Sequence, residues 1–379
     1  MYITSSELLN FDKEKLRLFL DKKYKEGLYL DYKENLSGKS KEEQHREFLK
    51  DVTAFANANG GNILIGVKEP ADNLSIEQQI IGLSDGENVA KDLERLSSNS
   101  IDPRISGLRI FAISLSDGKA VILVHIPSSL GRPHMVDYGK PRNFYIRHTE
   151  SSNPMSTYEI RESVISSLTS EARAKIYMER MEEDAIKYFM GEDSMILMQA
   201  MPLIPLEQPW EINEEVRNIV KGHKRLSRYQ LGLYSDDYPK LIIEGIQGRS
   251  ASPDCITEVH RNGYIFASFL NTVRHRNESK GLYLDPVICN LYHAFCEICS
   301  ELMKITNTDL PYILRCKYLG AYKTVFINAH RYGEDYSQPY PKDEIVWPDQ
   351  IRQIGDDFMK IADVWGEQLY NAFNREKPE

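Results

Sequence analysis

The chain has 379 residues, of which 41% are hydrophobic and 27% are charged, so it is long enough for two domains with sizeable cores. Its formal net charge of −9 argues against a protein that coats nucleic acid through an overall basic surface, but it does not exclude a local basic groove. No apolar run approaches the length of a membrane span, and the first seven residues lack a basic region followed by an apolar one. Five cysteines without framework spacing fit a reducing compartment, so we expect a cytoplasmic protein with no membrane partner.

The N-terminal part predicts a β-α-β unit. Helical spacing of apolar residues predicts helices over residues 5–23 and 42–57, and a short strand carrying Asp31 lies between them. Asn59-Gly60-Gly61 ends the second helix, because glycine adopts positive φ freely. The continuous β-branched run at residues 62–67 predicts a strand buried on both faces, and a parallel crossover of this kind should be right-handed.

A hairpin and a long helix follow. Two apolar runs, residues 108–115 and 120–126, flank Asp117-Gly118, which is a strong hairpin signal. Ser156 and Glu159 have the spacing of a capping box, and we expect the helix that they open to continue past residue 180. The other elements predicted here are a helix over residues 86–97 and a strand over residues 144–147. A βαβ unit combined with a hairpin predicts an α+β fold with a mixed sheet.

The C-terminal half also predicts an α+β domain, of a fold that we do not recognise. Residues 195–206 are apolar and are interrupted by Pro202 and Pro205, and a strand candidate lies at residues 241–243. Hairpins are predicted at Asn262-Gly263 and at Gly320-Ala321, the latter within residues 318–328. Two helices, residues 288–302 and 351–365, have heptad-like apolar spacing. This spacing is equally consistent with two arrangements: the helices pack on each other, or each of them packs on a sheet.

The predicted domain organisation has three parts. Residues 1–168 form the first domain, residues 169–190 a bridging helix, and residues 191–379 a C-terminal domain with a regulatory or oligomerisation role. If the C-terminal domain serves oligomerisation, we expect a homo-oligomer. Cys289, Cys296 and Cys299 share one helix flank without an obvious fourth ligand, so buried core residues are a better interpretation than a zinc site.

Three acids lie at the ends of the first two predicted strands. Glu26 and Asp31 flank the first strand, Glu69 ends the second, and Lys33 faces the same side as Asp31. Carboxylates at neighbouring strand ends can share a hard cation such as Mg²⁺ or Mn²⁺, and a nearby lysine suits phosphodiester hydrolysis. The alternative is that all of them are ordinary solvated charges at strand ends.

Several motifs between residues 20 and 168 together resemble the Schlafen AlbA-like domain family. The first is Glu26-x-x-x-x-Asp31-Tyr32-Lys33, followed by the run from Phe55 to Val67 that contains Asn59-Gly60-Gly61-Asn62. The others are Ile126-Pro127-Ser128-Ser129, Arg132-Pro133-His134, Phe144-Tyr145-Ile146-Arg147, and Met155 with Ser156 to Ile160. Asp31 stands where glutamate is common in the family, and Lys68-Glu69 replaces a commoner acidic pair.

The resemblance implies a function in RNA metabolism. The family contains metal-dependent endoribonucleases that cut tRNA-like RNA with three acids, which map by position onto Glu26, Asp31 and Glu69, with Lys33 beside the phosphate. We therefore expect a Schlafen-type endoribonuclease that uses Mg²⁺ or Mn²⁺ in bacterial antiphage defence. Two alternatives stay open: a non-catalytic regulator that binds RNA or DNA, and a nucleotide or ligand sensor.

A basic loop is the predicted nucleic-acid contact. It carries five cationic residues, namely Arg132, His134, Lys140, Arg142 and Arg147. Arginine grips phosphate in a bidentate manner, and aromatic residues such as Tyr138 and Tyr145 can stack on bases. The alternative is an ordinary exposed loop. A second basic run, residues 217–228, is a weaker candidate for the same role.

Overall fold

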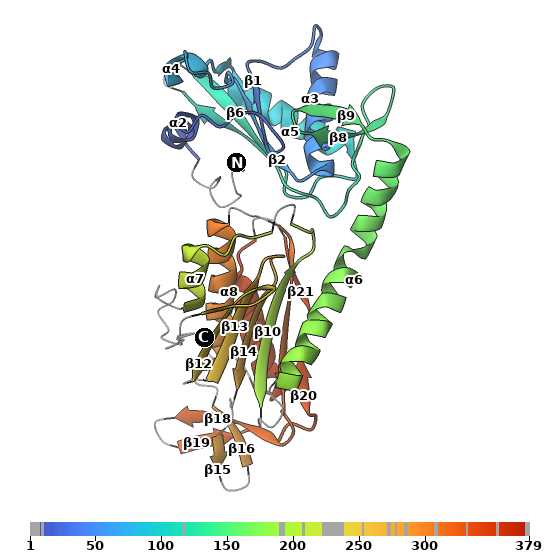
Figure 1. Cartoon of the computed structure of the whole chain (residues 1–379). Coiled ribbons are helices and arrows are strands. Elements are labelled where there is room, and N and C mark those ends of the chain that lie inside the picture. The colour runs from blue at the N-terminus through green and yellow to red at the C-terminus, as the bar shows by residue number, and fades with distance from the viewer. Residues whose placement is uncertain are drawn as a thin grey trace. The chain divides into compact units, whose positions relative to one another are not determined.

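The computed structural model describes residues 8, 11–115, 118–188, 194–206, 209–221, 239–251, 254–270, 274–276, 279–283, 287–306, 310–330, 333–353 and 356–375. The chain divides into two compact units, a first unit of Met1–Ser170 and a second unit of Glu171–Glu379 (Figure 1). Among the described helices, none has the length and apolar character that a bilayer-spanning helix requires.

The first unit is built on a five-stranded mixed sheet. Its strands are β1 (Leu30–Lys33), β2 (Gly61–Ile65), β3 (Leu83–Ser84), β5 (Arg109–Ser114) and β6 (Lys119–Ile126). The order is β1-β2-β6-β3, and β5 also pairs with β6. Strands β1 and β2 are parallel and joined through helix α3, whereas β6 runs antiparallel to its neighbours. The predicted βαβ unit, the β5–β6 hairpin and the α+β class are confirmed.

Helices cover both faces of this sheet. They are α2 (Lys13–Asp21), α3 (Lys41–Asn57), α4 (Ile76–Gln79) and α5 (Gly86–Ser100). Successive residues of a strand point to opposite faces, and β2 shows this directly. Ile63 and Ile65 pack with residues of α3 and α5, whereas Leu64 packs with residues of α2. In β1, Leu30 and Tyr32 belong to the α2 side, so Asp31 and Lys33 face the α3 side.

A small second sheet completes the first unit. It consists of β4 (Ile101–Asp102), β7 (Met135–Val136), β8 (Asn143–His148) and β9 (Ser151–Pro154), in that order. Strand β8 packs closely against α3. This packing brings a strand from residues 143–148 to the same helix that lies beside Asp31.

Helix α6 (Thr157–Tyr188) begins in the first unit and ends in the second. Its predicted capping box is confirmed: the Ser156 hydroxyl accepts from the Glu159 backbone N–H at 3.2 Å, and the Glu159 carboxylate accepts from the Ser156 backbone N–H at 2.7 Å. The helix continues past residue 180, as expected.

The second unit contains an eight-stranded antiparallel sheet. Its strands are β10 (Met195–Pro202), β11 (Lys240–Leu241), β12 (Gly245–Ala251), β13 (Asp254–His260), β14 (Ile265–Leu270), β17 (Tyr312–Leu319), β20 (Glu344–Val346) and β21 (Gln350–Arg352). The order is β11-β12-β13-β14-β10-β17-β20, with β21 also on β17. The hairpin predicted at Asn262-Gly263 joins β13 to β14. A further sheet, β15-β16-β18-β19, contains β15 (Arg274–Arg276), β16 (Ser279–Tyr283), β18 (Thr324–His330) and β19 (Gly333–Tyr336).

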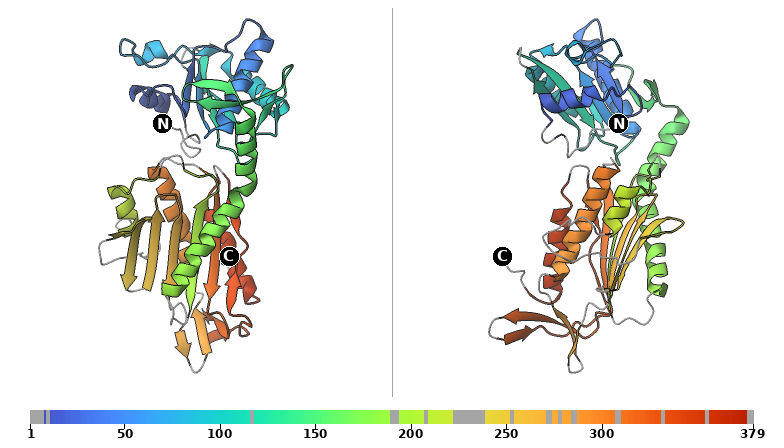
Figure 2. Two further views of the ribbon diagram at one scale, coloured as in Figure 1. Left: turned by 45° about the vertical axis from the view of Figure 1, so that its right-hand side comes forward. Right: turned by 60° about the vertical axis from the view of Figure 1, so that its left-hand side comes forward.

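One face of the eight-stranded sheet carries the apolar core, and α6 lies across the other (Figure 2). The core helices are α7 (Glu214–Lys221), α8 (Val287–Ile305) and α9 (Met359–Ala372). The rings of Phe295 and Trp365 stack with centroids 6.4 Å apart, so α8 and α9 pack on each other. Both helices also share the core with strands of the sheet. The helices therefore pack both on each other and on the sheet.

Three local predictions in the second unit are wrong or incomplete. Strand β17 pairs with β10, β20 and β21, whereas β18 pairs with β16 and β19, so no hairpin forms at Gly320. The helix expected from residue 351 begins at Met359, because residues 350–352 form β21. Strand β11 ends at Leu241. Cys296 and Cys299 are buried in the core as expected, while the side chain of Cys289 lies outside the described residues.

Candidate functional site

The structure brings Glu26 and Glu69 side by side at the β1–β2 edge of the first sheet. The backbone N–H of Glu26 donates to Oε1 of Glu69 at 3.3 Å. The backbone N–H of Tyr32, in β1, donates to Oε1 of Glu26 at 2.9 Å. Glu26 is half-buried and Glu69 is exposed, so this pair of carboxylates is open to solvent on one side.

Asp31 is buried, with only 2% of its surface exposed, and two cations hold it. Its Oδ1 lies 3.2 Å from Nη2 of Arg147, and its Oδ2 lies 2.7 Å from Nζ of Lys33. Arg147 is itself 3% exposed, stacks over the Phe55 ring at 4.3 Å and donates from Nε to the Gly27 carbonyl at 2.8 Å. A buried carboxylate needs such partners, because desolvation of an unpaired charge is costly.

Lys33 connects Asp31 to a fourth carboxylate, Asp51 of α3. The Lys33 ammonium lies 3.6 Å from Oδ2 of Asp51, and Asp51 accepts a hydrogen bond from the Ser152 hydroxyl at 2.9 Å. Burial lowers the pKa of Lys33, but the charge of Asp51 and the hydrogen bond that Lys33 donates to Asp31 outweigh this effect, so that pKa is raised overall. Burial is also the main reason why the pKa of Asp51 is raised.

Asp51 was missed in the sequence, although a signal for it exists. It lies three residues after Phe48 and four before Phe55, both of which are buried on the inner face of α3. A carboxylate at such an inward helical position needs a charged partner from another element. The identity of that partner, Lys33, is not visible in local spacing.

The three predicted acids influence one another electrostatically. The pKa of Glu26 is raised, first by burial and then by the charges of Asp31 and Glu69, while the Tyr32 hydrogen bond and Lys33 oppose the change. The three acids therefore lie in one region of the first unit. Among the described residues, however, no three His, Cys, Asp or Glu side chains are arranged as a metal-holding group.

The donor set fits a hard divalent cation in part. Glu26 and Glu69 present carboxylate oxygens from adjacent segments, which is the ligand chemistry that Mg²⁺ and Mn²⁺ prefer. Asp31 does not fit as arranged, because Lys33 and Arg147 engage both of its oxygens. Direct coordination by Asp31 would require the Lys33 ammonium to move away.

The five cationic residues predicted to contact nucleic acid do not share one surface. His134 is fully buried beside the Pro103 carbonyl, and burial lowers its pKa, so it is a neutral interior side chain. Arg132 is half-buried and donates to the Ala58 carbonyl, at the C-terminal end of α3, at 3.0 Å. Arg147 is enclosed with Asp31, as described above. The exposed members are Lys140 and Arg142, the latter paired with Asp137 at 2.5 Å.

The weaker basic run, residues 217–228, can be assessed only at its start. Arg217 and Lys221 lie on α7, whereas residues 222–238 fall outside the described part of the chain.

A match to a protein-family model agrees with this description of the first unit. The family model described as Schlafen, AlbA_2 matches residues 26–156. A solved structure, the N-terminal domain of a RecG-related protein from Nitrosomonas europaea, shares 16% sequence identity with a TM-score of 0.27, covering 39% of this chain and 94% of that one. Curated proteins yield no match. Residues 26–156, which include Glu26, Asp31, Glu69 and the basic loop, thus form a Schlafen AlbA_2 domain.

Proposed function

We propose that the first unit is a metal-dependent endoribonuclease of Schlafen type that cuts RNA such as tRNA. The observation that carries the proposal is the position of Glu26, which is held beside Glu69 and has a pKa raised by burial and by the charges of Asp31 and Glu69. Such a site carries more negative charge than its surroundings neutralise, and a bound cation would relieve it. An antiphage role and action on tRNA in particular are expectations from the family.

The residues of the site have distinct roles in this proposal. Glu26 and Glu69 would hold Mg²⁺ or Mn²⁺ directly, and Asp31 would be the third acid. The metal, when bound, would activate water and stabilise charge on the scissile phosphate. The ion pair with Arg147 would fix the position of Asp31, and the ion pair with Asp51 would hold Lys33 near an incoming phosphate. Exposed Lys140 and Arg142 would contact the RNA backbone.

The test is cleavage of a tRNA pool by the full chain with Mn²⁺, with Mg²⁺, and with EDTA. We expect metal-dependent cleavage that falls at least about 100-fold in Glu26→Gln, because loss of an essential ligand or charge removes several kcal/mol of transition-state stabilisation. Glu34→Gln is the matched control, since Glu34 is an exposed carboxylate just after β1. RNA binding by Glu26→Gln should stay within about twofold of wild type, because the exposed cations remain.

A second function has one observation in its favour. Asp31 is neutralised by Lys33 and Arg147, an arrangement that suits a structural role and a non-catalytic protein that binds RNA or DNA. This regulator would bind nucleic acid with wild-type and Glu26→Gln chains alike, and neither chain would cut it with Mn²⁺. Absence of both binding and cleavage would reject both functions.

A regulatory or self-associating role for the second unit is part of the same proposal. Helix α6 is continuous from the capping box at Ser156. The same helix makes polar contacts with the eight-stranded sheet of the second unit. Sedimentation of the full chain with and without RNA would measure the expected homo-oligomer.

A further inference from the structure

The second unit contains a pocket between the C-terminal half of α6 and strands β12, β13 and β14. Its volume is about 160 Å³. Cavities of about 150 Å³ in other proteins hold benzene, so this one accommodates a molecule of about six heavy atoms. The residues that matter for its chemistry are Met181, Asp184, Gln247, Glu258, Tyr264 and Phe266.

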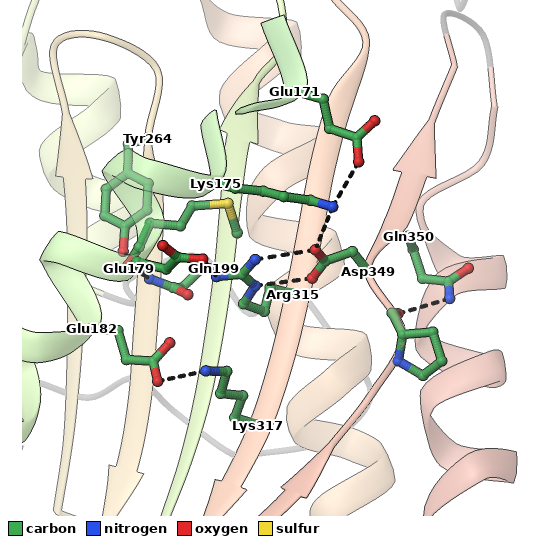
Figure 3. A network of polar contacts seen from close by, with 12 residues as sticks. Glu171, Lys175, Glu179, Glu182, Gln199, Tyr264, Arg315, Lys317, Asp349 and Gln350 are labelled. Carbon is green, nitrogen blue, oxygen red and sulfur yellow. Dashed lines mark hydrogen bonds and ion pairs between the residues drawn. The ribbon is translucent and has the colours of Figure 1, made fainter. Parts of the chain in front are cut away.

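The face of the sheet that carries this pocket holds several polar side chains. Residues Ile265, Ala267 and Phe269 of β14 point into the apolar core, so Tyr264, Phe266 and Ser268 point toward α6. Figure 3 shows the neighbouring part of this layer, where acids are matched by bases. Asp349 lies 2.9 Å from Nε of Arg315, and Glu182 lies 2.7 Å from Nζ of Lys317.

Among the described residues, Glu258 is paired with a histidine, which is charged only when protonated, instead of with a lysine or arginine. Its Oε1 accepts from Nε2 of Gln247 at 2.6 Å, and its Oε2 lies 3.0 Å from Nε2 of His260. The other His260 ring nitrogen lies 3.0 Å from the Tyr177 hydroxyl. Within the described residues, no lysine or arginine forms an ion pair with Glu258, although its side chain is largely buried. Asp184 also lines the pocket. Its Oδ1 lies 3.5 Å from Nζ of the exposed Lys187, a long distance for an ion pair.

Some buried polar groups in the layer around the pocket are incompletely paired. Tyr264 is fully buried, and its hydroxyl accepts from Nε2 of Gln199 at 2.8 Å. That Gln199 nitrogen also donates to the Met178 carbonyl, while the Gln199 side-chain oxygen is buried with no hydrogen-bond partner in the described structure. The Ser268 hydroxyl is also buried with no hydrogen-bond partner in the described structure. Gln199 and Ser268 do not line the pocket, so the groups that a cationic ligand could meet there are the carboxylates of Glu258 and Asp184.

We propose that this pocket binds a small organic cation, a primary ammonium group on a short apolar stem. The ammonium group lies against Glu258, whose carboxylate matches its charge. The stem lies against Met181, Ile256 and Phe266, and the rings of Tyr264 and Phe266 favour a cation at their faces. Three of the lining residues, Met181, Asp184 and Ala185, come from α6. This site belongs to the second unit and does not depend on RNA cleavage by the first.

The test is calorimetric titration of the full chain with n-butylammonium chloride. Sodium butyrate and 1-butanol, which have similar size but the opposite charge and no charge, are the ligand controls. We expect saturable binding of butylammonium alone, weakened at least about tenfold in Glu258→Gln because the charge is lost while the shape is kept. Glu183→Gln, an exposed position on α6 outside the pocket lining, should bind as wild type does.

A second variant keeps the test decisive if Glu258→Gln fails to fold. Met181→Trp fills the cavity without altering its charge and should abolish binding. Absence of butylammonium binding at millimolar concentration would overturn the proposal. Equal binding of butyrate or butanol, or wild-type affinity in both folded variants, would overturn it as well.

Discussion

At the scale of single residues, the first unit is organised around a buried group of charges. Asp31, Lys33, Asp51 and Arg147 come from β1, α3 and β8, and each charge has an opposite charge within 3.6 Å. Arg147 is the clearest example of a change in interpretation. Its position in a basic loop indicates phosphate contact, but its burial against Asp31 and Phe55 makes it part of the interior.

Glu26 should give the first unit a distinctive pH response. Burial, followed by the charges of Asp31 and Glu69, raises its pKa above the ordinary value of 4.5, so the folded state favours the protonated form. This contribution to stability is present below pH 4.5 and is lost as pH rises through the folded-state pKa. Gln cannot ionise, so the Glu26→Gln variant does not lose this stability as pH rises. Its free energy of unfolding, relative to that of wild type, should therefore increase as pH rises from 4.5 toward neutrality.

Urea unfolding followed by circular dichroism across that pH range measures this difference. Glu34→Gln, at an exposed position, is the control and should give a difference that stays constant with pH. A Glu26→Gln difference that is also constant, or that moves in favour of wild type as pH rises, would contradict the prediction.

At the scale of elements, the turn between α3 and β2 fixes where the β1–β2 edge lies. Gly60 has a φ of +74°, and a Cβ added there would come within 2.5 Å of the Ser128 backbone nitrogen. A Cβ on Gly61 would lie 2.4 Å from the Phe55 ring. Gly60 therefore permits a close approach between this turn and the segment after β6, and Gly61 permits close packing of the Phe55 ring, which explains the Gly60-Gly61 pair physically.

Replacement of Gly60 separates backbone strain from steric overlap when it is compared with Gly118. Gly118 has a similar φ of +77°, but a Cβ there would meet nothing within 4 Å. We expect Gly118→Ala to lower the free energy of unfolding by about 1–2 kcal/mol and Gly60→Ala to lower it by at least about twice as much. Chemical denaturation of both variants measures this. Equal losses would show that the contact with Ser128 is easily relieved.

At the scale of the whole molecule, the two units have separate hydrophobic cores. Two clusters of buried residues lie within the first unit, and one large cluster lies within the second. All three tryptophans, Trp210, Trp347 and Trp365, belong to the core of the second unit. Tryptophan fluorescence therefore reports on the second unit alone, whereas circular dichroism reports on both.

Separate cores predict two unfolding transitions, and Arg147→Leu should shift only one. Loss of this guanidinium leaves Asp31 buried with one cation fewer, so the first unit should lose about 3 kcal/mol of stability. The circular dichroism transition of the variant should move to lower urea concentration while the tryptophan transition stays unchanged. Arg142→Ala, at an exposed ion pair, is the control and should cost under about 1 kcal/mol. A single transition that shifts equally for both probes would contradict the separation.

Much of the first unit could be predicted because its signals are local. The period of apolar residues, the capping box of Ser156 and Glu159, and the Asp117-Gly118 turn each depend on neighbours within a few residues. The motifs of the Schlafen family add the assignment of residues 26–156. The hairpin predicted at Gly320 is wrong because strand pairing in the second unit is decided by distant partners of β17 and β18.

The sequence by itself determined the elements of the first unit, its family and the region where the acids gather. Only the tertiary structure decided which charges meet, because Asp31 and Arg147 lie 116 residues apart and their pairing follows from the packing of β8 on α3. The same holds for the pocket of the second unit, whose lining comes from α6, β12, β13 and β14. Local patterns specify helices and strands, whereas burial and ion pairing depend on which elements pack together.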